Sequence, residues 1–304
     1  MLSGVEIRSS GDITLGADWN MVNSAAGGET GVLTLRAGGN LNINNNLSDG
    51  FKSASAAYAS LGASPEAAQP LQADSVRGGR SWSYNMVAGA DMLSADVTAT
   101  LASDTKGDVN LAAGKLVRTG SGDIRMAAGR DIDLKSNTSV VYTAGRQSAP
   151  LAGFTQPVAT QRAWFTEGGG DIEMAAGRDV KGVASTQLYS NWLYRQGRVG
   201  GDGNTYTGGD QTAWWVRFDQ FAQGVAALGG GDVSVSAGNN VGNLSASAPT
   251  QGRVNSATAS NGKRAARNRL LAPACKAPSM PRPPAPKCCK HSPPPSRWTV
   301  HRWW

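Results

Sequence analysis

Short blocks of alternating apolar and polar residues recur along the chain, and each block is followed at once by a glycine-containing turn. In residues 122–134, Ile124 and Met126 alternate with charged side chains before an Ala-Ala-Gly-Arg turn, and Ile132 and Leu134 alternate with aspartates after it. Alternation with a period of two predicts a strand with one apolar face. This stretch is therefore expected to form a strand, a turn and a second strand.

Six copies of the first half of this block occur between residues 11 and 235. Each reads glycine, usually aspartate, then two apolar residues around a polar one, and the copies begin at Gly11, Gly31, Gly107, Gly122, Gly170 and Gly231. A seventh half-copy covers residues 88–92. Glycine tolerates positive φ, alanine lets neighbouring segments approach, and Asp or Asn bonds nearby backbone amides. The residues expected to define the repeat are Gly122, Asp123, Ile124, Met126, Gly129, Asp131 and Ile132.

The spacing of the copies favours a coil that returns on itself. Copies lie 20 residues apart between Gly11 and Gly31, and 15 apart between Gly107 and Gly122, which is close to one coil of a parallel β-solenoid. Equivalent residues would then stack about 4.8 Å apart and form an internal apolar ladder. The alternative is that the copies are hairpin strands of an antiparallel sandwich. Six copies with one turn type favour the all-β parallel solenoid.

The composition agrees with a repeat-built β protein. The 304 residues include 39 glycines, with 7% aromatic and 17% charged residues, which suits many turns better than a helical or doubly wound enzyme. The sequence shows no apolar leader at its start and no run of about eighteen apolar residues. Because residues 5–8 already alternate like a strand, the chain is expected to begin in mid-architecture, as a fragment of something longer.

The formal net charge of +7 hides two unlike parts. Residues 262–304 hold ten of the 29 basic residues, no acid, all three cysteines, both histidines and nine of the 14 prolines, so residues 1–261 carry a net charge of −3. One interpretation of this tail is a basic arm that binds nucleic acid or anionic lipid. The favoured one is an out-of-frame product of a GC-rich message. Residues 262–304 are predicted to be disordered and dispensable.

Insertions of unequal length separate the copies. Residues 46–86 include an Ala/Ser-rich piece, 53–68, that would form a short helix or an ordered loop, and residues 140–142 predict a further strand within 137–169. The third insertion, 182–229, holds eight of the 20 aromatic residues. Its rings either cover the coils as a satellite core or contact a glycan or receptor. The candidate surface-binding residues are Tyr189, Trp192, Tyr194, Trp214, Trp215 and Phe218.

Catalytic chemistry is not expected. Both histidines lie in the tail, which removes Ser-His-Asp and Cys-His arrangements from the repeats. A carbohydrate-active β-helix could still use Arg217 with Asp219, or Asp171 with Glu173, yet alternating strand positions place such pairs on an exposed outer face. The three cysteines, at 275, 288 and 289, lack Cys-x-x-Cys spacing. We therefore expect no catalytic residue, no metal site and no cofactor.

Four stretches resemble the large filamentous haemagglutinin-like exoproteins of Gram-negative bacteria. They are residues 79–84 (Gly-Arg-Ser-Trp-Ser-Tyr), 87–91 (Val-Ala-Gly-Ala-Asp), 113–120 (Ala-Gly-Lys-Leu-Val-Arg-Thr-Gly) and 214–221 (Trp-Trp-Val-Arg-Phe-Asp-Gln-Phe). The resemblance covers roughly residues 1–261. It implies a right-handed parallel β-helix that is exported through an outer-membrane transporter by two-partner secretion and then displayed or released as an adhesin. In that family an N-terminal secretion domain carries the export information, and we do not expect residues 1–261 to include it.

The leading expectation is a structural and adhesive segment that binds a glycan or protein receptor on a host or neighbouring bacterial surface. For the full-length relative, the resemblance implies a secreted or cell-surface location and a transporter partner in the outer membrane. Two alternatives are open: a carbohydrate-active β-helix enzyme, and binding of nucleic acid or an anionic surface through the basic tail. No specific nucleic acid and no transmembrane segment are expected.

Overall fold

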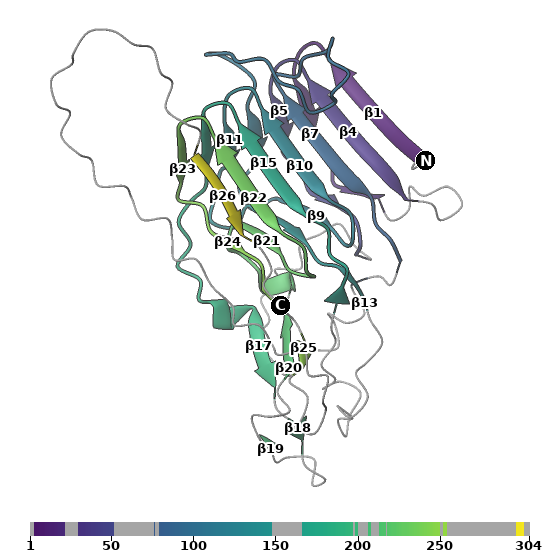
Figure 1. Cartoon of the computed structure of the whole chain (residues 1–304), viewed down its shortest axis with the longest axis vertical. Coiled ribbons are helices and arrows are strands. Elements are labelled where there is room, and N and C mark those ends of the chain that lie inside the picture. Colours follow the sequence, from purple (N-terminus) through teal and green to yellow (C-terminus); the bar gives the residue numbers. More distant parts are fainter. Residues whose placement is uncertain are drawn as a thin grey trace, which may run out of the picture.

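The structure is a computed structural model in which three sheets of parallel strands extend along a stack of coils (Figure 1). It describes residues 3–21, 30–51, 76, 79–147, 166–196, 198–199, 206–207, 213–216, 218–249, 252–253 and 296–300. Apart from short 3₁₀ turns, the regular structure of these residues is β. The chain is an all-β parallel solenoid, and the antiparallel sandwich is wrong for the repeats.

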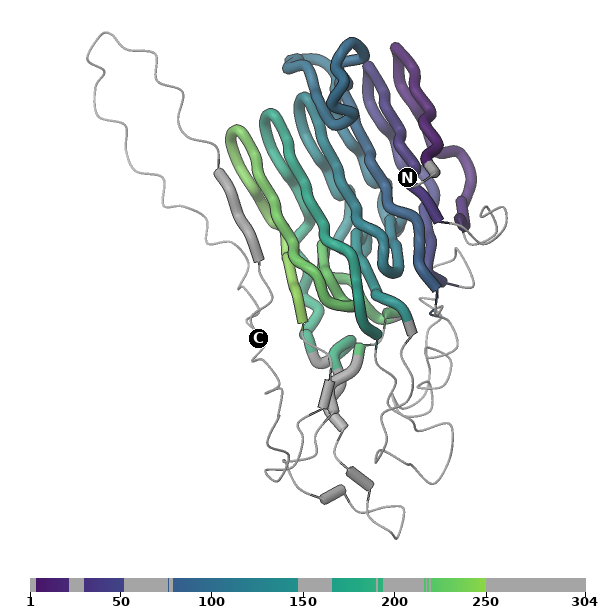
Figure 2. Tube along the Cα trace, turned by 45° about the vertical axis from the view of Figure 1, so that its right-hand side comes forward, coloured from purple at the N-terminus to yellow at the C-terminus, as the bar shows by residue number. Residues whose placement is uncertain are grey.

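Each coil contributes one strand to each sheet, and six coils follow one another. Sheet A holds β1 (Ser3–Ser9), β4 (Gly31–Ala37), β7 (Ser83–Ala88), β10 (Ile124–Ala128), β15 (Ile172–Ala176) and β22 (Val233–Ala237). Sheet B holds β2 (Ile13–Leu15), β5 (Leu41–Ile43), β8 (Val109–Leu111), β11 (Ile132–Leu134), β16 (Asp179–Lys181) and β23 (Asn240–Gly242). Sheet C holds β3 (Trp19–Asn20), β6 (Leu47–Ser48), β9 (Leu116–Thr119), β12 (Val140–Thr143), β21 (Val225–Ala227) and β24 (Ala246–Ser247). The stacked coils are clearest in the tube view (Figure 2).

The six sequence copies do not all occupy the same place in the coil. Those that begin at Gly31, Gly122, Gly170 and Gly231 lead into sheet A, whereas those at Gly11 and Gly107 lead into sheet B. The expected coil length of 15 to 20 residues is therefore wrong: equivalent positions in coils 1 and 2 are 28 residues apart. The corner before sheet A and the corner before sheet B each need a tight turn and an Asp or Asn, so the same sequence motif occurs at both. Residues 122–134 make two of the three strands of a coil, and β12 completes it.

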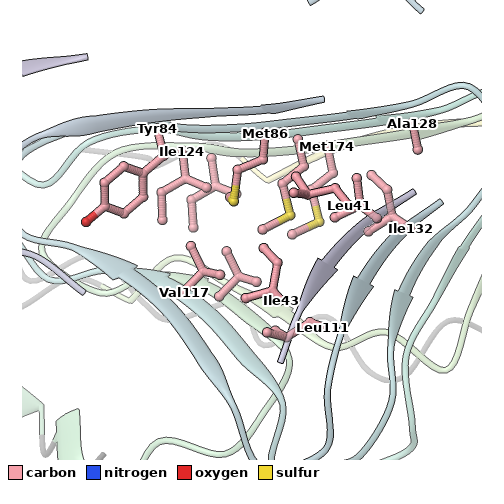
Figure 3. Close-up of a cluster of buried hydrophobic side chains, with 14 of the residues drawn as sticks. Leu41, Ile43, Tyr84, Met86, Leu111, Val117, Ile124, Ala128, Ile132 and Met174 are labelled. Carbon is pink, nitrogen blue, oxygen red and sulfur yellow. The ribbon is translucent and has the colours of Figure 1, made fainter. Parts of the chain in front are cut away.

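The inner faces of the three sheets share one hydrophobic core (Figure 3). In sheet A the pairing register aligns Met86, Met126 and Met174, and it places Ile124 beside Ile172. Each of these side chains is at most 2% exposed. The expected internal ladder of Ile, Val, Leu and Met is therefore confirmed.

Glycine at the corners is required by the closeness of successive coils. A Cβ at Gly122 would overlap the backbone carbonyl of Trp82 in the coil before, and one at Gly170 would overlap that of Gly122. At the next corner, a Cβ at Gly177 would overlap the backbone of Gly129. The glycines thus admit neighbouring backbone, which a larger residue would displace.

Insertions interrupt the connections from sheet C to sheet A, from sheet A to sheet B and from sheet B to sheet C, one example of each being described. The β13–β14 hairpin (Arg146–Gln147, Thr166–Glu167) lies between coils 4 and 5, and residues 89–106 form an ordered insertion in coil 3. Coil 5 carries the long insertion, with η5 (Tyr189–Asn191), β17 (Leu193–Gln196), β18 (Arg198–Val199), β19 (Tyr206–Thr207), β20 (Ala213–Val216) and η7 (Phe218–Gln220). The strand predicted at 140–142 is confirmed as β12. The Ala/Ser-rich piece at 53–68 lies outside the described residues.

The tail contributes a strand where disorder was expected. Ser296–Val300 form β26, which pairs with β22 at the end of sheet A. Before the tail begins, Gly252–Arg253 form β25 beside β20. The expectation of a wholly disordered tail is therefore wrong for the five residues of β26. The rest of 262–304 lies outside the described residues.

Candidate functional site

The coil 5 insertion lies against the outer face of sheet C. Along β12, Val141 belongs to the solenoid core, whereas its neighbours Val140 and Tyr142 belong to a second hydrophobic cluster on the opposite face. The other members of this cluster are Phe51, Val76, Leu116, Ala144, Trp192, Leu193, Val216, Phe218, Phe221, Ala226 and Leu228. Sheet C is thus buried on both faces where the insertion covers it.

Tyr142 is the centre of this outer cluster. Its ring stacks on Phe218 with centroids 6.3 Å apart and meets Phe221 edge-on at 5.7 Å. Trp192 meets Phe221 edge-on at 5.2 Å, and its Nε1 donates a hydrogen bond to Gln223 at 3.0 Å. Offset and edge-to-face contacts of this kind stabilise aromatic pairs beyond simple burial.

A buried cation ties the same cluster to the coils. The Arg118 guanidinium lies 3.8 Å from the centroid of the Phe51 ring, and Arg118 is 5% exposed. It donates to the Ser48 hydroxyl at 2.8 Å and to the Tyr142 hydroxyl at 3.0 Å. Arg118 therefore joins sheet C to the ring cluster and is not presented to a ligand.

The aromatic residues predicted to bind at the surface separate into three groups. Trp192 is fully buried and Phe218 is 6% exposed, so these two belong to the satellite core and not to a contact surface. Tyr189 is 48% exposed. The side chains of Tyr194, Trp214 and Trp215 lie outside the described residues, although their backbone forms the β17–β20 pair. Of the described rings in the predicted set, Tyr189 is the one accessible to a ligand.

A groove lies between the start of the insertion and the bend that precedes β12, and Tyr189 directly follows one of its lining residues, Leu188, in the chain. The groove encloses about 440 Å³ and is lined by Asn137, Thr138, Ser185, Thr186, Gln187, Leu188, Asn191 and Ala222. None of these side chains is charged. Leu188, on the rim, is 66% exposed. The sequence did not point to this groove, because its walls are ordinary loop residues separated by about fifty positions.

The side of the groove that the insertion forms is held in place by hydrogen bonds within the insertion. Gln187 donates to the carbonyl of Gln220 at 2.6 Å and accepts the N–H of Ala222 at 3.0 Å, and the Ser185 hydroxyl donates to the carbonyl of Ala222 at 3.0 Å. Asn137 and Thr186 are exposed on the groove. A neutral amide, a hydroxyl and an apolar rim suit a neutral ligand rich in hydroxyl groups, or a polar loop of another protein.

A second arrangement runs the length of the solenoid at the corner before sheet B. Six residues, here called the Asx column, occupy equivalent places in the six coils: Asp12, Asn40, Asp108, Asp131, Asp179 and Asn240. In each step the side-chain Oδ1 accepts the backbone N–H of the next member, at 2.7, 3.0, 3.1, 3.2 and 3.1 Å in order. The turn aspartates were expected to bond nearby amides, and they instead bond those of the next coil.

Basic side chains line the Asx column on its exposed side. Arg178 donates to Asp131 at 2.6 and 2.8 Å, and Lys181 donates to the same carboxylate at 2.7 Å. The hydrogen bond from Arg178 holds the pKa of Asp131 well below its usual value despite the burial of the carboxylate. Burial is the largest single influence on Asp108 and would raise its pKa, but the hydrogen bond from Arg130, the backbone hydrogen bond from Asp131 and the positive charge of Arg130 together outweigh burial and lower that pKa. Carboxylates held ionised and bonded at both oxygens join coils and are poorly suited to proton transfer.

Of the two charged pairs considered for carbohydrate chemistry, the described one, Asp171 with Glu173, does not form an enclosed site. Asp171 and Glu173 are both exposed on sheet A, and Asp171 accepts the N–H of Asp232 in the next coil at 2.8 Å. Glu173 lies 3.7 Å from Arg125, with both side chains more than half exposed. Arg217 and the side chain of Asp219 lie outside the described residues. Such solvated pairs contribute little to stability and do not enclose a substrate.

Comparison of the chain with family models, curated proteins and solved structures finds no match. Within the described residues, three or more His, Cys, Asp or Glu side chains do not gather where they could hold a metal ion. The same part of the chain contains no helix that is long and apolar enough to cross a membrane.

Proposed function

We propose that the chain is a structural and adhesive segment of a filamentous haemagglutinin-like exoprotein, built as a right-handed parallel β-helix. The observation that carries the proposal is the difference between the repeated coils and the insertion of coil 5. The coils repeat one another with their polar corner residues bonded between coils, whereas the insertion of coil 5 adds a neutral groove with an exposed apolar rim. In solenoids, insertions of this kind commonly carry binding.

The expected ligand is a glycan or a protein loop on a host or neighbouring bacterial surface. The full-length protein would reach the cell surface through an outer-membrane two-partner secretion transporter. A lining of amides, hydroxyls and one leucine supports contacts with hydroxyl groups and apolar sugar faces more than contacts with charged ligands. The proposal assigns no reaction to the chain.

Binding of the full chain to immobilised glycans and to whole cells, measured by biolayer interferometry and flow cytometry, tests this function. The double variant Leu188→Ser with Tyr189→Ala removes the exposed leucine that lines the groove and the exposed ring that follows it in the chain, and we expect it to lower binding at least tenfold. Leu93→Ser is the matched control, because Leu93 is 97% exposed on the insertion of coil 3. Equal binding by both variants would reject the groove, and no binding by the wild-type chain would reject the adhesive function.

A further inference from the structure

The two ends of the solenoid differ in how their backbone edges are covered. Within the described residues, β1 pairs with β4 on one side and its other edge is open, whereas β22 pairs with β15 on one side and with β26 on the other. All pairs in sheet A are parallel except β22 with β26. Strand β26 is therefore not a seventh coil but a strand laid in reverse across the edge (Figure 1). An uncovered strand edge is a template for another strand.

The open end exposes core positions. Val5 and Ile7 pair in register with Leu33 and Leu35 of the next coil, which are each 2% exposed. Val5 is 47% exposed and Ile7 is 38% exposed. These side chains are therefore part of the internal ladder but lack a neighbour on their outer side. Along the seven residues of β1, the backbone edge that faces away from β4 has no partner strand among the described residues.

The opposite end carries the same side-chain columns. Strand registers connect Val233 through Ile172, Ile124, Tyr84 and Leu33 to Val5. A second copy whose coil 6 lies against coil 1 would place its Val233 beside Val5 and its Val235 beside Ile7, as any two successive coils do. The apolar columns would then continue from one molecule into the next.

The Asx column would continue in the same way. Within the chain, the Asn40 side-chain oxygen accepts the backbone N–H groups of Gly107 and Asp108, both at 3.0 Å. Asn240 is the same residue type at the equivalent place in coil 6, and Asp12 is the equivalent residue in coil 1. Asn240 of one copy is thus suited to accept the backbone N–H of Asp12 in another. The polar corner therefore supports the same alignment as the apolar columns.

We propose that, in a chain of these 304 residues, β26 is a displaceable cap, and that the end it covers binds the β1 end of a second copy of the same chain. The two strands compete for one edge: β26 covers five residues of β22, whereas coil 1 of another copy offers β1, β2 and β3 to sheets A, B and C together. The interface is head to tail, and the translation between coils does not close a ring. Uncapped chains therefore grow into filaments.

The cap is tested in the full chain by Trp298→Pro combined with Thr299→Pro. Alternate residues of a strand direct their N–H groups to opposite sides, so one of the two prolines removes a donor to β22. We expect the wild-type chain to elute at its monomer mass of 31.4 kDa, and the proline variant to form multiples of that mass that increase with concentration. Light scattering after size exclusion measures the mass, and electron microscopy detects filaments. A proline variant that stays monomeric up to its solubility limit would overturn the proposal.

The opposite end is tested by adding Val5→Lys and Ile7→Lys to the proline variant. Lysines at the open end should return the mass to the monomer, whereas Val97→Lys with Val183→Lys should not, because these control valines are 36% and 46% exposed and do not belong to β1. Association that survives the edge lysines would overturn the head-to-tail contact. Since the lysine variant keeps its coil 6 end, it should also shorten filaments of the proline variant when mixed with them.

A peptide of residues 294–302, added in excess, provides a test that does not depend on how the edge variants fold. If β26 covers the end of coil 6, the peptide should occupy that end in the proline variant and return it to the monomer mass. Association that is unchanged by the peptide would show that β26 is not the cap.

Discussion

The carboxylate of Asp131 joins two successive coils, because its Oδ1 accepts the backbone N–H of Asp179 at 3.2 Å. Its Oδ2 is bonded by two cations of the same neighbouring coil, Arg178 at 2.6 Å and Lys181 at 2.7 Å. Asp131 is 5% exposed, while the side chains of both cations are more than 40% exposed. One residue thus receives a backbone donor and two charged donors across a single coil interface.

Substituting Asp131→Asn should weaken this interface. The amide has one neutral oxygen, and when that oxygen accepts the N–H of Asp179 the NH₂ group faces the donors of Arg178 and Lys181. We expect a loss of about 1.5 to 3 kcal/mol in the free energy of unfolding, toward the lower figure because solvent screens the cations. Urea unfolding followed by circular dichroism measures it. Asp133→Asn is the control: Asp133 pairs only locally with Lys135, and its change should stay within about 0.5 kcal/mol.

The effect of Asp131→Asn should depend on pH in a defined direction. The folded pKa of Asp131 is lowered, so its contribution is complete above the unfolded value of about 3.9 and is lost as the pH falls toward the folded value. The pKa of Lys181 is raised by its hydrogen bond to Asp131, so the contribution of Lys181 is complete below its ordinary 10.5 and is lost as the pH rises through the folded value. The stability difference should therefore be level from about pH 5 to 9 and shrink on acidification. A difference that grows in acid would contradict this assignment.

Gly122→Ala should be strongly destabilising. Its Cβ would overlap the carbonyl and the following amide of the preceding coil at Trp82 and Ser83, and backbone cannot move aside as a side chain can. Overpacking of this kind costs about 3 kcal/mol. Gly16→Ala is the matched control, because a Cβ there meets nothing within 4 Å. Thermal unfolding of the two variants should differ clearly, and equal melting temperatures would show that the coils are not stacked this closely.

Trp192→Ala should unfold the insertion before it affects any surface contact. The ring is fully buried against Phe221 and its Nε1 is bonded to Gln223, so its removal leaves a cavity and an unpaired amide oxygen. The expected loss is about 3 to 5 kcal/mol. Tyr189→Ala, at a 48% exposed ring, should change stability by about 0.5 kcal/mol or less. Hydrogen exchange on residues 183–228 separates local opening of the insertion from loss of the whole solenoid.

The sequence pattern was sufficient for the strands and for the stacking, but not for the assignment of strands to sheets. Alternation around Ile124 and Met126 predicts an apolar inner face, and the register confirms it. The copies at Gly107 and Gly122 read alike because both corners require a tight turn and an Asp or Asn. Their similarity therefore carried no information about which corner each one forms.

The groove could not be predicted because tertiary folding of the insertion creates it. Thr138 and Gln187 line the same cavity, yet neither belongs to a repeat or to a recognisable binding motif. The aromatic residues were visible in the sequence, but their exposure was not. Trp192 and Tyr189 are three positions apart, and one is buried while the other is half exposed, because sheet C covers only one side of the insertion.

The parallel pairing of successive coils has a mechanical consequence. Hydrogen bonds between parallel strands run along the solenoid axis, so a pull on its two ends stretches those bonds lengthwise, one coil interface after another in series. The interface with the fewest bonds yields first and then relieves the others of strain. The coil 5 insertion leaves the coil at a corner after Lys181 and returns before Val225, beside this line of force. The groove spans one of these interfaces, because Asn137 and Thr138 lie in coil 4 and the rest of its lining lies in the coil 5 insertion. Opening of that interface under tension would therefore separate the two sides of the groove.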